Sequence, residues 1–420
     1  MQPIRGTKDI LPHEVKNWQK IYEIIREILS QNSYHEIRTP IIENTELFRR
    51  SIGDFTDIVN KEMYTFNDQG KRLITLRPEG TAGIARAFIS NKLYLKNKIN
   101  RLWYLGPMFR YERPQQGRQR QFHQLGIECI GSLMPIADVE VIRLAVKILE
   151  DIHFTSWTLE INSIGNIQER ERYTNNLISY LSKYKYDLDI NSQIKLKDNP
   201  LRILDSKDLK TQEILLKSPK LKNYLGSESL THFNTICNQL NSIGIKYEIN
   251  DNLVRGLDYY NYTAFEIKTQ SINQQNTICG GGRYDQLIKQ LGGPYTPSVG
   301  WAMGIERLIM TLDKKLSIKE EVTTIYIVTS SIYKSDNLWN TVKVIDKYKL
   351  NFEIDLSNNN LNKQLRRANQ IGANICFIIK DDEIKNKYIT VKWMRTHIQQ
   401  TINLSQLENY LKYLKKHLNT

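Results

Sequence analysis

The segment Arg101–Gly131, RLWYLGPMFRYERPQQGRQRQFHQLGIECIG, decides the fold because it places two apolar runs on either side of a polar loop. The runs Leu102–Tyr111 and Phe122–Ile130 are rich in strand-forming residues, and Arg, Gln, Pro and Gly fill the loop between them. We therefore predict an antiparallel hairpin with a long polar tip.

One face of this hairpin is predicted to carry a cluster of polar groups. Because side chains alternate along a strand, Gln124 and Glu128 share a face around a glycine. Arg110 and Glu112 of the first strand point the same way. Buried polar groups are costly unless something pairs with them. They could pair with one another across the strands, but the glycine and the basic tip favour a bound polar ligand, with a phosphate near Arg110 and Arg118.

Length and composition limit the class of protein. A chain of 420 residues is too long for one core and predicts about two or three domains. It is 40% hydrophobic with a formal net charge of +14, which favours an ordered protein with a polyanionic partner. Its four widely spaced cysteines indicate a reducing compartment and no zinc site. No apolar run reaches membrane-spanning length and the N-terminus lacks a signal core, so we expect a soluble, untargeted chain.

Helical periodicity organises much of the chain before residue 314. Apolar residues at helical spacing predict helices at Pro12–Gln31, Thr45–Ser51 and Ala137–Ile152. Residues 166–250 are rich in Asn, Lys, Leu and Ser, lack glycine clusters and keep helical periodicity. We interpret this segment as a helical insertion.

The segment Leu73–Gly83, LITLRPEGTAG, predicts a strand followed by a helix that starts near Ala82. Thr81 could be only a helix N-cap, and Glu79 only a favourable acid near the helix dipole. The alternative is that both side chains pair with the ammonium group of a ligand.

The segment Leu253–Ile267, LVRGLDYYNYTAFEI, is a second dense polar patch. A surface turn would account for its glycine and aspartate, but not for an arginine and two tyrosines so close together. Convergent polar and aromatic groups mark binding sites. We therefore predict ligand contacts from Arg255, Tyr259 and Tyr260.

Two glycine-rich segments follow. Thr277–Leu287, TICGGGRYDQL, predicts a strand that ends in three glycines before a helix, and it lacks the GxGxxG pattern of a Rossmann domain. Gly300–Leu312, GWAMGIERLIMTL, predicts a helix with its apolar residues facing the core. Arg307 projects from the opposite side, where it is either solvated or in contact with a ligand.

The last part of the chain predicts a separate α/β unit after a charged linker. Strands and helices alternate in β-α-β order, which indicates a mostly parallel sheet covered by helices. The pattern carries no catalytic constellation. Its basic residues favour a binding surface instead: Lys363, Arg366, Arg367, Lys392 and Arg395.

These motifs resemble those of the class II aminoacyl-tRNA synthetases, and of the histidyl-tRNA synthetases in particular. FRYERPQQGRQRQFHQLGIE is similar to motif 2, and SVGWAMGIERL is similar to motif 3. LVRGLDYY and GGGRYDQL resemble the two histidine signature motifs, and Arg38–Phe66 resembles motif 1. NPLRILDSKD and QLRRANQIGANICFIIKDDE extend the likeness over essentially the full length.

The resemblance implies an α+β class II catalytic domain, with an antiparallel sheet and helices, made of residues 1–165 and 251–313. The helical insertion would occupy 166–250. A linker at 314–322 would lead to an α/β anticodon-binding domain at 323–420. The resemblance also implies a homodimer built through motif 1.

The resemblance further assigns residues to a site for ATP and L-histidine. Arg110 would hold the α-phosphate, and Arg255 would approach that phosphate and the histidine carboxylate, so these two are the expected catalytic residues. The expected ATP-binding residues are Arg110, Glu112, Arg118, Phe122 and Arg307. The expected histidine-binding residues are Glu79, Thr81, Arg110, Gln124, Glu128, Arg255, Tyr259 and Tyr260. No side-chain metal ligands are expected.

The implied activity is that of a histidine–tRNA ligase, which converts L-histidine and ATP into histidyl-adenylate and diphosphate and then esterifies the 3′ end of tRNA(His). The substrate carboxylate is the nucleophile, so alignment and cationic stabilisation suffice without a side-chain base. Mg²⁺ would neutralise the departing diphosphate. The expected partners are tRNA(His), histidine, ATP and a second copy of the chain, with no membrane and no DNA.

The expected location is the cytoplasm, or the plastid stroma if the gene is organellar. Richness in Asn, Ile, Lys and Tyr is typical of an AT-biased genome. Gln116 and Gln119 stand where bacterial members commonly carry Lys and Tyr, so acceptor-end contacts are expected to differ while phosphate chemistry is not.

The competing class is the catalytically silent relative that serves as the regulatory subunit of ATP phosphoribosyltransferase. Such proteins typically lack the C-terminal domain and degrade the LVRGLDYY patch, whereas this chain retains both. A plain RNA-binding protein would not need Glu79, Gln124 and Glu128 together with Arg255.

Overall fold

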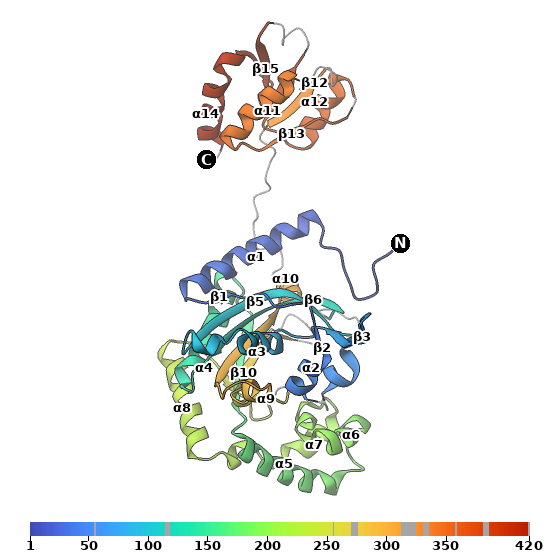
Figure 1. Ribbon diagram of the computed structural model, residues 1–420, viewed down its shortest axis with the longest axis vertical. Coiled ribbons are helices and arrows are strands. Elements are labelled where there is room, and N and C mark those ends of the chain that lie inside the picture. Colours follow the sequence, from blue (N-terminus) through green and yellow to red (C-terminus); the bar gives the residue numbers. More distant parts are fainter. Residues whose placement is uncertain are drawn as a thin grey trace. The chain divides into compact units, whose positions relative to one another are not determined.

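The chain forms two compact units, Met1–Ser317 and Ile318–Thr420 (Figure 1). The computed structural model describes residues 1–53, 56–113, 118–254, 256–269, 276–311, 325–330, 336–357, 359–380 and 386–418. The predicted linker at 314–322 lies outside these residues, and the predicted domain boundaries stay a prediction. Across the described ranges, no helix is long and apolar enough to cross a bilayer.

The first unit is built on one large sheet, whose described strands run in the order β1-β5-β6-β11-β10-β9-β7-β8. Its inner strands are antiparallel to one another in this order: β5 (Asn100–Phe109), β6 (Gln121–Ile130), β11 (Ser298–Gly304), β10 (Thr277–Arg283), β9 (Asn261–Thr269) and β7 (Trp157–Ser163). Two short edge strands, β1 (His35–Glu36) and β8 (Glu248–Ile249), pair in parallel. The expected class II antiparallel sheet is confirmed, with a parallel strand added at each edge.

The predicted hairpin is the pair β5–β6, and its register fixes which residues share a face. Tyr104 lies opposite Gly126, and Leu102 lies opposite Glu128. A Cβ at Gly126 would stand 2.2 Å from the Cζ atom of Tyr104. The glycine therefore makes room for a tyrosine ring beneath the site, not directly for the ligand.

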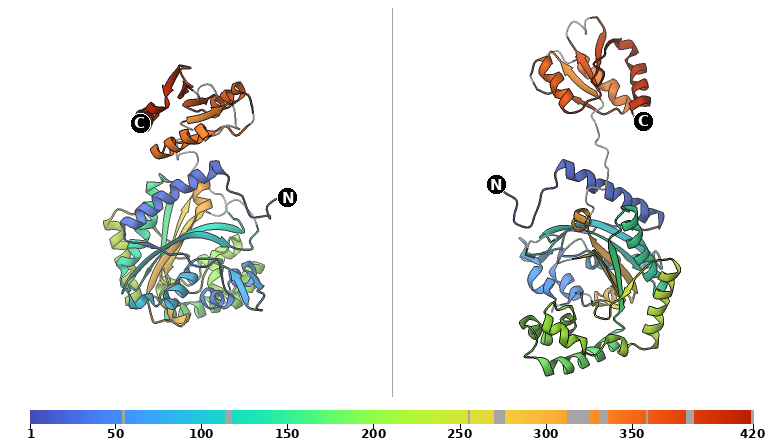
Figure 2. Two further views of the ribbon diagram at one scale, coloured as in Figure 1. Left: turned by 45° about the horizontal axis from the view of Figure 1, so that its top comes forward. Right: turned by 180° about the vertical axis from the view of Figure 1, so that it is seen from behind.

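The face of β6 that carries Leu125, Ile127 and Cys129 packs into the main core with α1 (Pro12–Gln31) and α4 (Pro135–Asp151). Figures 1 and 2 show α1 along the sheet on the side away from most of the insertion, although insertion residues Ile236 and Leu240 pack into the same core as α1. The opposite face carries Tyr104 and packs with α3 (Thr81–Ser90) and the insertion. The apolar stripe of α1 thus covers the first face of the sheet only, and the polar cluster of the hairpin lies on the second face.

The segment predicted to be a helical insertion is helical. Its elements are α5 (Ile167–Leu181), α6 (Ile190–Asp198), the 3₁₀ turn η4 (Pro200–Asp205), α7 (Leu209–Leu216) and α8 (Ser227–Ser242). Asn166 caps α5, because its side chain accepts a hydrogen bond from the Glu169 amide.

A smaller sheet, β2-β4-β3, lies in the segment that resembles motif 1. It is formed by β2 (Ile42–Asn44), β4 (Leu73–Leu76) and β3 (Tyr64–Asn67), and α2 (Thr45–Ile52) follows β2 directly. The predicted short helix at Thr45–Ser51 is confirmed, and Gly53 caps it with a φ of 98°.

One of the two predictions about the glycine-rich segments is wrong. The predicted strand with three glycines is confirmed as β10, which ends at Arg283 directly after them, and a short helix, α9 (Leu287–Gln290), follows. Residues 300–304 belong to strand β11, so the helix is shorter, α10 (Ile305–Thr311). Close backbone approach explains the glycines of both strands: a Cβ at Gly281 would stand 2.3 Å from the Gly300 carbonyl oxygen.

The second unit is a sheet in the order β13-β12-β14-β15-β16 with helices against it. Strands β12 (Ile325–Thr329), β13 (Phe352–Ile354) and β14 (Ile375–Ile379) are parallel, whereas β15 (Tyr388–Trp393) and β16 (Gln399–Asn403) are antiparallel. The helices are α11 (Asp336–Tyr348), α12 (Leu361–Gln370) and α14 (Leu407–Leu418). The predicted β-α-β order is confirmed, but the sheet is mixed instead of mostly parallel.

Candidate active site

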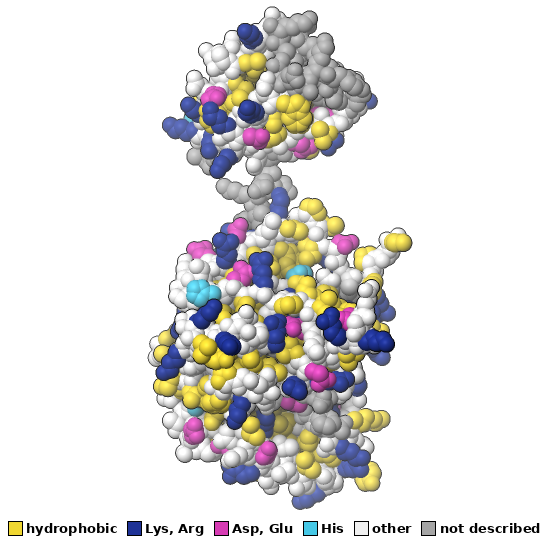
Figure 3. Space-filling model, viewed as in Figure 1, with side chains coloured by type: hydrophobic (Ala, Val, Ile, Leu, Met, Phe, Trp, Pro, Cys, Tyr) yellow, Lys and Arg dark blue, Asp and Glu magenta, His cyan; other side chains and the backbone are white. Residues whose placement is uncertain are grey.

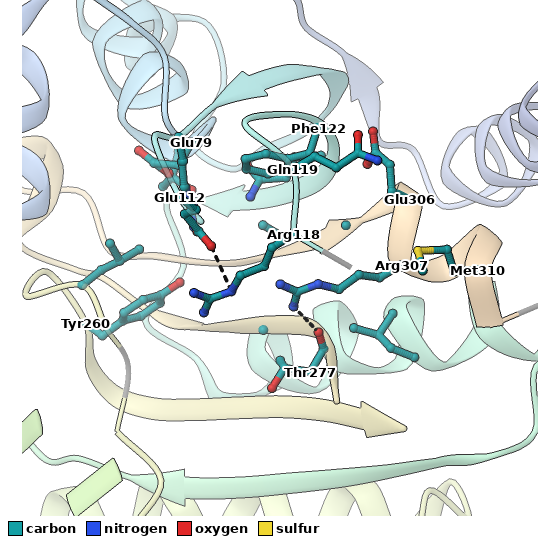
Figure 4. Close-up of a pocket in the computed structure, with 18 of the residues that line it drawn as sticks. Glu79, Glu112, Arg118, Gln119, Phe122, Tyr260, Thr277, Glu306, Arg307 and Met310 are labelled. Atoms are coloured by element: carbon teal, nitrogen blue, oxygen red, sulfur yellow. Dashed lines mark hydrogen bonds and ion pairs between the residues drawn. The ribbon is translucent and has the colours of Figure 1, made fainter. Parts of the chain in front are cut away.

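A cavity of about 190 Å³ lies in the first unit where the hairpin, the start of α3, the 257–260 segment, β10, β11 and α10 meet (Figure 4). Of the predicted site residues, the following line it: Glu79, Thr81, Arg110, Glu112, Arg118, Phe122, Gln124, Tyr259, Tyr260 and Arg307. Glu128 is joined to this lining through Thr81. Arg255 lies outside the described residues. The fold therefore brings the described members of the predicted set together, while their ligand contacts stay a prediction.

Glu79 is the buried acid at the start of α3. Its carboxylate accepts hydrogen bonds from the amides of Thr81, at 2.8 Å, and Ala82, at 2.7 Å. The role of a favourable acid at the helix N-terminus is thus real, but the same side chain also lines the cavity. Burial raises the pKa of Glu79, against the lowering effect of the two amide bonds.

The Thr81 side chain forms a hydrogen bond at the bottom of the cavity and does not cap helix α3. Its Oγ1 donates to Glu128 Oε1 at 2.8 Å, and the N-cap position of α3 is Gly80, without a side-chain cap. Of the two alternatives for Thr81, the helix N-cap is therefore excluded, because its hydroxyl donates across to the sheet.

Glu128 is held between two donors at the bottom of the site. Thr81 donates to its Oε1 atom and the Tyr284 hydroxyl donates to its Oε2 atom. It is 1% exposed, and burial raises the pKa of this carboxyl to about 8, in spite of both bonds. A Cβ at Gly300 would stand 1.9 Å from Glu128 Oε2, so only a glycine leaves space for the carboxylate.

Gln124 is fixed beside Glu79 by two further bonds. Its Oε1 atom accepts from the Gly80 amide at 3.1 Å and from the Tyr104 hydroxyl at 3.2 Å. This orients the side chain toward the same end of the cavity as the two carboxylates. That end is rich in acceptor oxygens and therefore suits a ligand that carries N–H donors.

The other end of the cavity is cationic. Arg110 donates from Nε to the Pro78 carbonyl at 2.8 Å, and its guanidinium lies 5.3 Å from the centre of the Phe122 ring. Arg118 and Arg307 reach into the same space from different elements (Figure 4). Three guanidinium groups around one cavity suit an anion such as a polyphosphate.

Some of these charges are already paired, as the alternative interpretation of the hairpin predicts. Arg118 Nε lies 2.9 Å from Glu112 Oε2, and Arg307 Nη1 donates to the Thr277 carbonyl at 2.7 Å. Burial lowers the pKa of Arg307, and the nearby Arg118 lowers it further. The charges of the hairpin are only partly paired with one another, however. Arg110 donates to the Pro78 carbonyl, and Glu128 accepts from Thr81 and Tyr284.

Two family models match nearly the whole chain. The histidyl-tRNA synthetase model matches residues 6–308, and the anticodon binding domain model matches residues 324–414. The chain belongs to the histidyl-tRNA synthetase family. Its fold is that of the family's class II catalytic domain joined to an anticodon-binding domain.

Individual members of the family match over almost their full length. The chloroplastic histidine–tRNA ligase of Gracilaria tenuistipitata var. liui is 57% identical over 416 residues, which cover 99% of this chain and 98% of that protein. The histidine–tRNA ligase of a Cyanothece species is 49% identical over 407 residues, covering 97% and 95% of the two chains. The apo crystal structure of S. aureus histidyl-tRNA synthetase is 34% identical with a TM-score of 0.80, and the match covers 99% of this chain and 100% of that one.

The site also contains residues that the sequence analysis did not select. The Tyr104 hydroxyl donates to Gln124 Oε1, and the Tyr284 hydroxyl donates to Glu128 Oε2. Strand alternation puts Tyr104 on the same face as Arg110, so that signal was present. Tyr284 lies in the signature GGGRYDQL, but nothing in the pattern tells which residue it contacts.

Glu306 is another residue that the sequence analysis missed. Its two carboxylate oxygens each accept from the His123 amide at 2.8 Å, and its Oε1 lies 2.9 Å from His123 Nδ1. These bonds tie the start of α10 to β6 and so place Arg307 beside the hairpin. The contact spans 183 positions in the chain, which no local pattern can reveal.

No metal cluster belongs to this site as far as it is described. Within the described ranges, no group of three or more His, Cys, Asp or Glu side chains could hold a metal ion. The four cysteines lie within the described ranges, where they are buried and form no disulfide bond.

Proposed function

We propose that this chain is a histidine–tRNA ligase that acts through the cavity described above. One observation supports this most: one end of the cavity is lined by Glu79, Thr81 and Gln124, with Glu128 bonded to Thr81, and the other end is lined by Arg110, Arg118 and Arg307. The α-ammonium and imidazole N–H groups of histidine suit the first end, and the phosphates of ATP suit the second. A ligand that joins the two ends would place the histidine carboxylate next to the α-phosphate.

In this proposal Glu79, Thr81 and Gln124 receive the α-amino group of histidine. Glu128 and Tyr260 read the imidazole, with Tyr259 packed against Tyr260 at 4.6 Å between ring centres. A site whose buried groups hydrogen-bond both imidazole nitrogens discriminates strongly against other amino acids, since an analogue without these nitrogens would leave the buried groups unpaired. The rigid support of Glu128 by Thr81 and Tyr284 favours this role.

In the same proposal the cationic end of the cavity binds ATP. Arg110 would hold the α-phosphate, Glu112 and Phe122 would place the adenine, and Arg118 would reach the outer phosphates. Arg307 would cover the adenine from the other side. Mg²⁺ would enter with the phosphates of ATP and supply charge neutralisation for the departing diphosphate.

The chemistry then needs no side-chain base. A histidine carboxylate oxygen attacks the α-phosphorus, the bond to the β-phosphate oxygen breaks, and diphosphate leaves with the electron pair. Arg110 and Arg255 would stabilise the charge that builds on the α-phosphate. In the second step the hydroxyl of the terminal adenosine of tRNA attacks the histidyl carbonyl, and AMP leaves.

We also propose tRNA(His) and a second copy of the chain as partners. Lys and Arg side chains are spread over the visible face of each unit, which suits a polyanion (Figure 3). Ile42, at 49% exposure, and Phe66, at 45%, are exposed apolar side chains on the small sheet of motif 1, which favours a dimer interface there. The plastid stroma is the proposed compartment, since the Gracilaria relative is named chloroplastic.

The regulatory subunit of ATP phosphoribosyltransferase is not favoured as an alternative. Residues 324–414 match the anticodon binding domain model, and the LVRGLDYY motif is intact. The test is the charging of a tRNA(His) transcript with labelled histidine in the presence of ATP and Mg²⁺. We expect acid-precipitable histidine to accumulate with wild-type protein, and its absence would contradict the proposal.

A further inference from the structure

The insertion segment Asn199–Asp205, part of the NPLRILDSKD motif, touches the loop that carries the histidine signature LVRGLDYY. Arg202, in the turn η4, is the central contact. Its Nη1 atom donates to Asp57 Oδ2 at 2.6 Å, and its Nη2 atom donates to the Gly256 carbonyl at 2.7 Å. One guanidinium therefore joins the insertion, the motif 1 segment and the signature loop.

The position of the second bond matters because Gly256 directly follows Arg255 in the chain. A Cβ at position 256 would stand 3.1 Å from Arg202 Nη2, so the glycine permits this close approach. Arg202 is itself mostly buried, with 14% of its side chain exposed, whereas Asp57 is 53% exposed. A guanidinium held on two sides is a rigid support for a backbone carbonyl.

Neighbouring contacts hold the loop on both sides of position 255. Upstream, Asn162 Nδ2 donates to the Leu253 carbonyl at 3.0 Å. Downstream, Asn199 Nδ2 donates to Asp258 Oδ1 at 3.1 Å, and Arg170 donates to the Tyr260 carbonyl. Asn199, Arg202 and Arg170 all belong to the insertion, so the insertion supplies the downstream support.

We propose that Arg202 is a positioning residue for adenylate formation. Its guanidinium bridges the Gly256 carbonyl and the Asp57 carboxylate, and this bridge fixes the signature loop beside the cavity. The inference rests on the proposed function, in which Arg255 stabilises the α-phosphate. A displacement of a catalytic group by about 1 Å can cost on the order of 100-fold in rate. Loss of this support would therefore lower kcat more than it weakens substrate binding.

The test compares Arg202→Ala with Lys210→Ala in histidine-dependent ATP–diphosphate exchange without tRNA. Lys210 makes an ion pair with Asp187 at 2.7 Å within the same insertion, and both partners are exposed. Removal of Lys210 thus controls for the loss of an insertion ion pair. We expect Arg202→Ala to lower kcat by about 10- to 100-fold with little change in KM for histidine, and Lys210→Ala to match wild type.

Two further variants separate positioning from simple folding. Asp57→Ala removes the other partner from an exposed position and should lower kcat less, because Arg202 keeps its bond to Gly256. In the double variant the Asp57 effect should disappear. Arg202→Lys should restore part of the rate, since an ammonium can donate to the carbonyl without bridging both groups.

The outcomes distinguish this inference from the proposed function. If wild-type protein catalyses exchange and neither Arg202→Ala nor Asp57→Ala lowers kcat, Arg202 is only structural and the inference is overturned. A lower melting temperature with unchanged kcat would lead to the same conclusion. If wild-type protein itself gives no exchange with histidine, the proposed function fails first.

Discussion

Thr81 Oγ1 donates a hydrogen bond of 2.8 Å to Glu128 Oε1, although the two residues are 47 positions apart in the chain. This bond joins the start of α3 to the middle of the central hairpin. Since Glu79 accepts from two amides at the start of the same helix and lines the same cavity, the helix start and the hairpin form one rigid acceptor surface. The predictions below follow from this surface and from the cationic end opposite.

The first prediction concerns the pH dependence of stability. Burial raises the pKa of Glu128 to about 8 from the ordinary value of 4.5. Between these values the folded state binds more protons than the unfolded state, so the stability that this group contributes is present at low pH and is lost as pH rises toward about 8. Glu128→Gln should remove this component. Urea unfolding across that range should show the free energy of unfolding of wild type falling relative to the variant, and parallel curves would contradict the prediction.

The second prediction concerns the space beside Glu128. A Cβ at position 300 would stand 1.9 Å from Glu128 Oε2 and 2.4 Å from the Ile127 carbonyl oxygen. Gly300→Ala should displace the carboxylate and raise KM for histidine by about tenfold or more, with a smaller effect on KM for ATP. Gly70→Ala is the matched control, because its Cβ would meet only the side chains of Asp68 and Arg72, at 3.3 Å or more. Equal histidine KM values in the two variants would show that Glu128 does not read the substrate.

The third prediction concerns Arg307 at the cationic end. Its guanidinium is held by the Thr277 carbonyl at 2.7 Å and is proposed to cover the adenine. Arg307→Ala should raise KM for ATP by about tenfold, while calorimetry should show unchanged binding of histidine alone. Arg101→Ala, which breaks an ion pair of 3.0 Å with Glu140 outside the cavity, is the control. Loss of histidine affinity in Arg307→Ala would contradict the division of the cavity into two ends.

The fourth prediction separates the two steps of the reaction. Arg366 is an exposed residue of α12, and α12 and α14 pack into the two different hydrophobic clusters of the second unit. Arg366→Glu should raise KM for tRNA(His) by about tenfold and weaken its salt dependence, because one fewer phosphate is neutralised, without changing histidine-dependent exchange. Lys412→Glu makes the same charge change on α14 and should have the smaller effect. Equal effects of the two variants would argue for non-specific attraction.

The elements that the sequence predicted best are those with strong periodicity. Pro12–Gln31 forms a helix with the predicted limits because its apolar stripe repeats without interruption. The β-α-β order of the second unit was also predicted, since its strands β12 and β14 are buried along their whole length. Strand β16 was missed because its sequence, QQTIN, is polar and lies at the sheet edge.

The errors at the site have a different cause. Residues 300–304 were predicted as helix because glycine and small residues give no clear period. Their ladders to β6 and β10 define them as a strand. The residue types of the cavity could be predicted from the motifs. The bonds between Glu306 and His123, or between Tyr284 and Glu128, depend on strands that meet only in the folded sheet.

The most direct test of the whole account is ATP–diphosphate exchange, run with each of the twenty amino acids in turn and without tRNA. The cavity joins an acceptor-rich end to a cationic end, so we predict exchange with histidine alone. Exchange with several amino acids would contradict the reading of imidazole by Glu128 and Tyr260. No exchange with histidine, in a protein that still binds it, would contradict the catalytic account and favour a regulatory role.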